Sequence, residues 1–283
     1  MNTDCMSGGE SLPLAPKPCF SATPSNGGYP RNAPLCDAHV HLVQCGMLPQ
    51  FSACVSEYFA CTCAHDRDEF ARQEELIASC AGTRLHFVGA FGMHPQMPLE
   101  ENADFLEDLL RERKIGAVGE AGFDLFTPEF AAQIERQERV WAIQVALAAS
   151  HGVSLVVHAR KAQERIFRDA KKLKAVPAVI FHSFAGSPQD ARSLLRRGIN
   201  GFFSFGKPIL NGKKSAIACV RELPLERLLL ETDAPFQTLR DEARTEPEEI
   251  ARVYEAAAGL RGSGVEEIAA QVRNNFGAAY GIG

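Results

Sequence analysis

The sequence predicts a single (β/α)8 barrel of the TIM type, an α/β fold, from three observations. Eight short apolar runs recur along the chain, and segments with helical patterning separate them. Strands that alternate with helices favour a parallel sheet covered by helices. The residues after position 34 are as many as the ~250 that one such barrel uses, so no second domain is left over.

The apolar runs are near-continuous rather than alternating. This pattern suits parallel strands, because both faces of such strands are buried. The expected strands cover residues 35–42, 58–64, 85–91, 115–121, 153–159, 178–184, 201–205 and 228–232.

The intervals between the runs carry helical patterns and end signals. Residues 66–79 are rich in Glu, Arg, Gln and Ala, and 104–113 and 130–150 repeat apolar residues at spacings of three to four. Ser187-Pro188 supplies a cap and a first-turn proline for a further helix. No glycine-rich phosphate loop follows the first run, which disfavours the alternative fold, a doubly wound open sheet.

Residues 1–34 differ from the rest of the chain. Pro, Gly and Ser together supply 14 of these 34 residues, and neither Val nor Ile occurs. Such a segment buries too little apolar surface to offset its ordering entropy. We therefore expect a disordered N-terminal extension at 1–34 and one barrel domain at 35–283.

Composition and charge exclude several classes of protein. The chain is 46% apolar and 23% charged, as in soluble globular proteins, and its net charge of −5 argues against wide electrostatic attraction to nucleic acid. No apolar run reaches the ~18 residues of a membrane span, and no secretory signal precedes residue 35. Nine irregularly spaced cysteines do not suggest a disulfide framework. A cytoplasmic location is expected, with no membrane and no obligate protein partner.

Candidate metal ligands stand at the ends of the predicted strands rather than at their starts. The carboxyl ends of all strands of a closed barrel meet at one mouth, where barrel active sites lie. Histidines without a common role would not be expected at the carboxyl end of one strand after another. The residues are His39, His41, His94, Glu120, His158, His182 and Asp233.

The first strand and the last supply ligands for one cation. His39 and His41 lie on the same strand face, so both imidazoles reach one ion. Asp37 shares that face one step deeper and would orient one of the rings. Asp233 would bind the same ion and accept a proton from an attacking water.

The middle strands supply ligands for a second cation. Glu120 offers two oxygens and is able to bridge both ions. His158 and His182 come from neighbouring strands and would hold the second ion.

The other histidines are interpreted as structural or exposed. His86 begins a strand, and His151 lies in the last turn of a helix, where the dipole favours a cation. His65 is interpreted as a surface residue after the second strand. Cys61, Cys63 and His65 form an alternative zinc site, although the usual two-residue spacer is missing; otherwise the two cysteines share one face of a buried strand.

The ordered motifs of the chain resemble the TatD family of metal-dependent hydrolases, often called TatD-type deoxyribonucleases. The resemblance extends from about Leu35 to Tyr280. The ordered group of motifs is specific for the family, whereas any single motif is not. The matching stretches are Asp37-Ala-His-Val-His41-Leu, Gly92-Met-His-Pro95, Val118-Gly-Glu-Ala-Gly-Phe-Asp124, His158-Ala-Arg160, Phe181-His-Ser-Phe-Ala-Gly186 and Leu230-Glu-Thr-Asp-Ala-Pro235, with Gln137, Trp141 and Gln144 in the helix before the fifth strand.

The resemblance implies a two-metal site that acts on DNA ends with Mg2+ or Mn2+; ligand softness also allows Zn2+. By matching positions, one ion would be held by His39, His41, Glu120 and Asp233, and the other by Glu120, His158 and His182. His94 would meet the substrate's phosphate or a metal-bound water.

Two charged stretches bear on the substrate. The basic stretch 160–174 is either a solvated helix face or a phosphate-facing rim, with Arg160 as a candidate substrate-binding residue. The acidic stretch 239–249 replaces the Arg-Gly and Asn-X-Pro usual in the family, and would form a lip that repels a long polyanion. Ser183 also departs from the Cys-Phe-Ser-Gly that usually follows the sixth-strand histidine.

The resulting prediction is a two-metal phosphodiesterase or deoxyribonuclease acting on DNA or a short oligonucleotide, with Asp233, Glu120 and His94 as catalytic residues. An amidohydrolase-type esterase, lactonase or amidase is the alternative. Many barrels of that kind bridge their metals with a modified lysine at the end of strand four, where Glu120 stands here; Lys114 is at that strand's start. A non-catalytic metal-binding barrel is the third possibility.

Overall fold

Eight parallel strands form one sheet in sequential order in the computed structural model, which describes residues 33–51 and 55–282. Residues 1–32 of the predicted leader lie outside the described residues. The strands are β1 (Ala33–Val40), β2 (Val55–Ala64), β3 (Leu85–Phe91), β4 (Ala117–Asp124), β5 (Ser154–Arg160), β6 (Val179–Phe181), β7 (Gly201–Phe205) and β8 (Leu228–Leu230).

Backbone hydrogen bonds join the two ends of this sheet. Asp233 N donates to His39 O at 2.9 Å, and His41 N donates to Ala234 O at 2.8 Å. Both bonds run between β1 and the segment that follows β8, so the sheet curls into a barrel. The predicted TIM-type barrel is confirmed.

Predicted and observed strand bounds agree to the residue for β3 and β7, whereas β6 and β8 are shorter than predicted. Each short strand is followed by a non-glycine residue with positive φ: Ser183 at 45° and Asp233 at 54°. Extended backbone cannot continue through such residues. The chain therefore turns at the barrel mouth, where both residues line the cleft described below.

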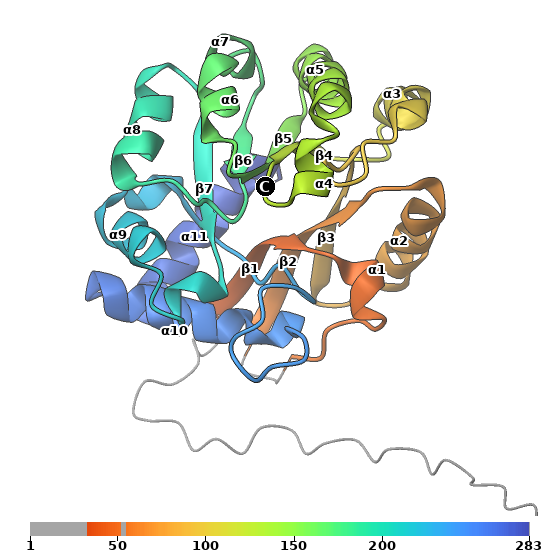
Figure 1. The fold of residues 1–283 in the computed structure, drawn as a ribbon. Coiled ribbons are helices and arrows are strands. Elements are labelled where there is room, and N and C mark those ends of the chain that lie inside the picture. Colours follow the sequence, from red (N-terminus) through yellow and green to blue (C-terminus); the bar gives the residue numbers. More distant parts are fainter. Residues whose placement is uncertain (1–32, 52–54, 283) are drawn as a thin grey trace, which may run out of the picture.

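Helices lie around the outside of the strands (Figure 1). The predicted helix at 130–150 is divided into two, α4 and α5. The helices are α1 (Leu42–Cys45), α2 (Arg67–Ser79), α3 (Ala103–Arg111), α4 (Pro128–Ala131), α5 (Ile134–His151), α6 (Gln163–Arg168), α7 (Ala170–Leu173), α8 (Pro188–Arg196), α9 (Lys214–Glu222), α10 (Ile250–Arg261) and α11 (Val265–Tyr280), with short 3-10 turns at Glu100–Asn102, Lys207–Ile209, Leu225–Arg227 and Pro247–Glu249.

Capping side chains fix several helix starts. Asp66 accepts a hydrogen bond from Glu69 N and so begins α2. Ser187 and Asp190 form a reciprocal capping box at α8, as the Ser-Pro pair predicts. None of the helices of the described residues is long and apolar enough to cross a membrane.

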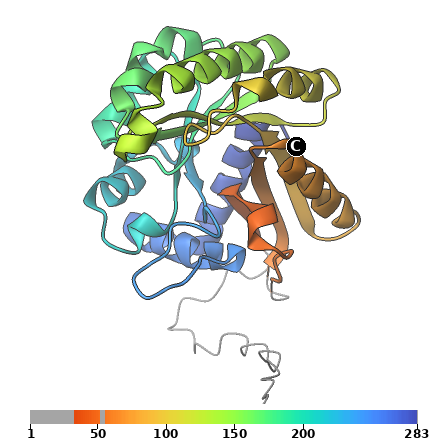
Figure 2. The same cartoon turned by 45° about the vertical axis from the view of Figure 1, so that its right-hand side comes forward.

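The C-terminal helices hold the first strand in place. These helices, blue in Figure 2, lie next to the orange-red segment that begins the barrel. The Tyr254 hydroxyl of α10 donates to Cys36 O at 3.0 Å and accepts from Cys36 N, and the Tyr280 hydroxyl of α11 donates to Ala38 O. Because the backbone of β1 is anchored from outside, His39 and His41 are held rigidly at its carboxyl end.

Two buried glutamines of α5 support loops at the barrel mouth. Gln144 pairs with the backbone N–H and C=O of Met93, and Gln137 pairs in the same way with Asp124. These are the glutamines of the helix motif, and they hold the loop that carries His94 and the end of β4 that carries Asp124. These hydrogen bonds from the buried side of α5 therefore fix the backbone that carries His94 and Asp124 at the barrel mouth.

Candidate metal centre

A cleft of about 470 Å³ opens at the carboxyl ends of the strands. Most of the residues that line it are polar, and five of them are histidines, whereas apolar and aromatic side chains line most ligand pockets. The lining residues are His41, Gln44, His65, His94, Gln96, Glu120, His158, Ala159, Arg160, His182, Ser183, Ala185, Pro208, Lys213, Asp233, Phe236 and Gln237.

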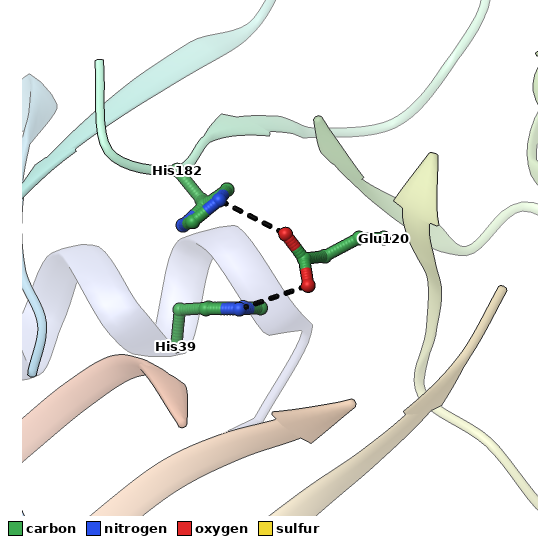
Figure 3. Close-up of side chains that lie close together, drawn as sticks. All are labelled: His39, Glu120 and His182. Atoms are coloured by element: carbon green, nitrogen blue, oxygen red, sulfur yellow. Dashed lines mark ion pairs between the residues drawn. The ribbon is translucent and has the colours of Figure 1, made fainter. Parts of the chain in front are cut away.

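Glu120 lies buried at the centre of this cleft, and its two oxygens face different groups of imidazoles. The Oε2 atom is 2.9 Å from His182 Nε2, 3.2 Å from His158 Nδ1 and 3.7 Å from His94 Nε2. Figure 3 shows His182 and His39 on the two sides of the carboxylate, each facing its own oxygen.

The Oε1 atom of Glu120 faces three other rings. His39 Nε2 is 3.3 Å away, and His41 Nε2 and His65 Nε2 are each 3.4 Å away. Asp233 Oδ1 completes this side, 3.4 Å from His41 Nε2 and 3.6 Å from His39 Nε2.

Two glycines allow β4 to present Glu120 at this point. A Cβ on Gly119 would lie 2.6 Å from Val156 Cβ, and a Cβ on Gly122 would lie 2.0 Å from His158 O. Both glycines also have positive φ. The Gly-Glu-Ala-Gly sequence is therefore what lets β4 approach β5 closely enough for Glu120 to meet His158.

Carboxylates stand behind the rings on the Oε2 side. Asp124 Oδ2 is 3.0 Å from His158 Nε2, and Glu231 Oε1 is 3.6 Å from His182 Nδ1. A carboxylate hydrogen-bonded to the second nitrogen of an imidazole, as Asp124 is to His158, fixes the ring and raises its basicity as a ligand. Glu231 lies beyond hydrogen-bond distance of His182 and acts on that ring through its charge. Neither acid was singled out from the sequence, although both lie within the quoted motifs.

The cluster shifts the pKa values of its members in opposite directions. Burial raises the pKa of Glu120, but the surrounding imidazoles of His39 and His182 outweigh it and hold that pKa well below its usual value. Burial lowers the pKa of His94 to about 3. Burial also lowers the pKa of His182, but Glu120 and Glu231 outweigh it and raise that pKa well above its ordinary value.

The donor set fits divalent metal ions. Six imidazoles surround the buried Glu120 carboxylate, and Asp233 adds a second carboxylate beside His39 and His41. Imidazole nitrogens and carboxylate oxygens gathered in this way are the ligands that divalent ions take in proteins. Within 33–51 and 55–282, Glu120 Oε1 and His65 Nε2 are buried without a hydrogen-bond partner. Four groups of described residues bring three ligand atoms within 4.8 Å of one another: His39, Glu120 and His182; His39, His41 and Asp233; His41, His65 and Glu120; and His94, Glu120 and His158.

All seven residues singled out at strand ends meet in this cluster: His39, His41, His94, Glu120, His158, His182 and Asp233. Arg160 lines the same cleft. His86 and His151 lie elsewhere. His86 pairs with Glu57 and stacks on Phe59, and His151 is exposed at the end of α5.

Two interpretations from the sequence are wrong. His65 is not a surface residue: it is 8% exposed and faces Glu120. Asp37 does not orient an imidazole. Its carboxylate accepts from Thr232 N, Thr232 Oγ1 and Tyr58 Oη, and so ties β1 to the segment after β8. The spacing of residues along β1 and β2 does not determine which partners the Asp37 and His65 side chains face.

His65 could have been found by the rule that found the others, because it directly follows a strand. The ligand groups of the described residues contain no cysteine, which argues against zinc at Cys61 and Cys63. Both cysteines are buried in β2, and Cys63 Sγ lies 3.6 Å from His39 Nδ1.

Ion pairs neutralise much of the acidic stretch 239–249. Lys207, almost fully buried, pairs with Glu242 and Glu249, and Arg252 pairs with the same two acids. Glu246 pairs with Arg244. The predicted acidic lip is therefore corrected: these three acids fasten the loop and leave little free negative charge.

The basic stretch 160–174 divides in two. Arg160 lines the cleft, and its guanidinium lies 4.2 Å from the ring centroid of the exposed Phe126. Arg165 and Arg168 instead pair with Glu138 of α5. Only the start of the stretch is thus placed to meet a substrate, and the rest matches the solvated-face interpretation.

The family described as TatD related DNase matches residues 36–281 of this chain. An uncharacterized metal-dependent hydrolase of Bacillus subtilis, YabD, is 33% identical over 74% of this chain and 82% of its own. A 3′-5′ ssDNA/RNA exonuclease, TatD of Pantoea ananatis, is 32% identical over 68% of this chain and 76% of its own.

Solved structures show the same architecture. The crystal structure of YjjV, a TatD homologue from Escherichia coli, superimposes with a TM-score of 0.73 at 27% identity, covering 88% of this chain and 98% of that one. An uncharacterized amidohydrolase from Saccharomyces cerevisiae superimposes with a TM-score of 0.70 at 16% identity, covering 86% and 98%, and shows likeness of fold alone.

Proposed function

Because the chain belongs to the TatD family of metal-dependent hydrolases, we propose that it is a two-metal phosphodiesterase that shortens single-stranded DNA or RNA from the 3′ end. The observation that carries the proposal is the position of Glu120, whose two oxygens face two separate groups of imidazoles. Such a carboxylate suits two neighbouring ions. The substrate class comes from the relatives named as exonucleases.

The ligand sets proposed for the two ions follow the two oxygens. His39, His41, Glu120 and Asp233 would hold one ion, and Glu120, His158 and His182 the other. Mg2+ or Mn2+ is the proposed metal. Bound divalent ions at these places supply Lewis-acid charge and lower the pKa of a coordinated water.

We propose Asp233 as the general base. Its Oδ1 faces His39 and His41, while its Oδ2 accepts a hydrogen bond from Gln237 Nε2 at 3.0 Å. Burial raises the pKa of Asp233, but His41 and the neighbouring histidines outweigh it, so the carboxylate is ionised and ready to take a proton. As the water oxygen bonds to phosphorus, its proton passes to Asp233. The bond from phosphorus to the 3′ oxygen of the shortened strand breaks, and that oxygen takes a proton from solvent, so that the terminal nucleotide is released with its phosphate.

His94 is proposed to donate to the phosphate. Gln96 N donates to His94 Nδ1 at 3.2 Å, so that nitrogen accepts and the proton resides on Nε2, which faces the cleft. With its pKa lowered to about 3 by burial, the ring is neutral and donates a hydrogen bond without carrying charge.

The size and rim of the cleft suit a single-stranded end. A volume of about 470 Å³ has room for one nucleotide rather than a duplex. Arg160 and Lys213 offer cations at the rim, and the half-exposed Phe236 offers a ring on which a base can stack. We propose that these residues hold the end of the strand.

End-labelled single-stranded DNA and RNA test the proposal. Metal-stripped protein should be inactive, added Mg2+ or Mn2+ should restore stepwise loss of nucleotides from the 3′ end, and chelator should abolish it. The His39→Ala protein should lose activity by orders of magnitude. Equal activity with and without chelator would contradict the proposal.

A substrate panel separates the alternatives. Lys114 is half-exposed at the opposite end of β4, where it pairs with Glu112 at 3.4 Å, so it does not reach the cleft as a bridging lysine would. Hydrolysis of lactones or amides without hydrolysis of oligonucleotides would nevertheless replace the phosphodiesterase proposal. Stoichiometric metal without any hydrolysis would favour a non-catalytic barrel.

A further inference from the structure

His65 directly follows β2 and turns into the cleft, although no strand-two residue belongs to the ligand sets above. The residue is 8% exposed, and its ring lies between those of His41 and His94, at centroid distances of 5.5 and 4.9 Å. The polar atoms of a buried ring of this kind are in most cases hydrogen-bonded or liganded.

Helix α2 and the loop after β3 together fix the orientation of this ring. His65 N donates to Glu69 Oε2 at 2.8 Å, which anchors the residue to the first turn of α2. His65 Nδ1 lies 3.3 Å from Gly92 O. A carbonyl oxygen only accepts, so Nδ1 carries the proton and the lone pair is left on Nε2.

That lone pair points at another acceptor. His65 Nε2 lacks a hydrogen-bond partner in the described part of the chain, and its near neighbour is Glu120 Oε1 at 3.4 Å, itself buried and unpartnered. Two buried acceptors that face one another are unfavourable unless a proton on His65 or a metal ion lies between them. Burial lowers the pKa of His65, but Glu120 and Glu69 outweigh it and raise that pKa, so this position favours positive charge. His41 Nε2 lies within 4.8 Å of both atoms and completes a three-ligand group.

We propose that His65 is a metal ligand, the third imidazole on the Oε1 side of Glu120, where it shares an ion with His41 and Glu120. The inference rests on the metal site of the proposed function but not on its substrate. A third imidazole makes this side rich in nitrogen, and nitrogen ligands favour Co2+ or Zn2+ over Mg2+, which prefers oxygen. His65 would therefore set the metal preference of this chain.

Metal binding by full-length variants tests the proposal without relying on activity. The variants are His65→Gln, His65→Ala and, as a matched control, His151→Ala at the exposed end of α5. Glutamine keeps a group that donates to Glu120 but is a poor ligand for Co2+. Titration of metal-stripped protein with Co2+, followed by visible absorption, should show binding at least about 10-fold weaker in both His65 variants.

The control and the Mg2+ titration complete the design. His151→Ala should bind Co2+ like the unmodified protein, and the affinity of the His65 variants for Mg2+ should change much less than their affinity for Co2+. If His65→Gln binds Co2+ with unchanged affinity and spectrum, His65 only positions Glu120, and the proposal is overturned.

A measurement on the unmodified chain covers the case in which the variants fail to fold. A crystal structure grown with Zn2+ should place the ion about 2.1 Å from His65 Nε2. An ion bound by Glu120 but well beyond ligand distance of His65 would overturn the proposal. Metal bound through His65 without nuclease activity would instead defeat the proposed function and leave this inference standing.

Discussion

The two oxygens of Glu120 face halves of the site that are built differently. On the Oε2 side the rings of His158 and His182 are backed by the carboxylates of Asp124 and Glu231. On the Oε1 side the second nitrogens of His39 and His65 meet neutral groups, the Cys63 thiol and the Gly92 carbonyl. Carboxylate backing strengthens an imidazole ligand. We therefore expect tighter metal binding on the Oε2 side and the nucleophile to be prepared on the Oε1 side, where Asp233 lies.

The largest effect is expected from Glu120→Gln, because this residue is common to both halves. The variant should bind neither ion tightly, and exonuclease activity should fall by about 10^4-fold or more, since Lewis-acid charge and nucleophile activation are lost together. Metal content by elemental analysis and turnover on labelled oligonucleotides measure this. Loss of only one ion would show that the halves do not depend on a shared carboxylate.

Asp233→Asn should affect the Oε1 side alone. We expect turnover to fall by about 10^2- to 10^4-fold, the range for loss of a general base. Metal on the other side of Glu120 should be retained, and the exposed Asp241→Asn in the same loop should behave like the unmodified protein. Equal loss of both ions would contradict the division into halves.

Asp124→Asn tests the carboxylate backing. The carboxylate holds His158 at 3.0 Å and accepts from Gln96 Nε2 at 2.8 Å, and these hydrogen bonds keep its pKa below the usual value although burial raises it. We expect metal affinity on the Oε2 side to fall by about 10- to 100-fold. Cys63→Ser, the matching change behind His39, should have a much smaller effect. Similar losses in the two variants would show that the backing groups are not what distinguishes the halves.

The smallest effect is expected at the rim. Phe236 is 48% exposed and contacts the His41 ring edge-on, so Phe236→Ala should raise KM for oligonucleotides about fivefold while kcat changes little, because base stacking is worth about 1–3 kcal/mol. Met47→Ala, also exposed but outside the cleft lining, is the control. A fall in kcat with unchanged KM would place Phe236 in the metal site rather than in substrate binding.

The sequence predicted the barrel because its strands are buried on both faces and read as plain apolar runs. Gly201–Phe205, buried along its whole length, was predicted to the residue for this reason. Leu85–Phe91 was also predicted to the residue from its apolar run, although its first residues are only half-buried. The strand-end placement of His39, Glu120 and Asp233 was equally readable, because parallel strands bring all their carboxyl ends to one mouth.

The same reasoning does not determine where polar side chains point once they reach the mouth. His65 was assigned to the surface and Asp37 to an imidazole, and the structure reverses both. The negative charge of the stretch 239–249 also misled the prediction of a repulsive lip. The residue that neutralises Glu242 and Glu249 is Lys207, which lies far from them along the chain.

What the sequence by itself determined is the fold, the family and the residues that stand at the barrel mouth, because burial periodicity and strand ends are local properties of the chain. What only the tertiary structure decided is which nitrogen or oxygen faces which partner: His65 toward Glu120, Asp37 toward Thr232, Asp124 toward His158. Those pairings depend on how closely β4 packs against β5 and on how the loops after β2 and β8 turn, and such distances arise between segments far apart in sequence.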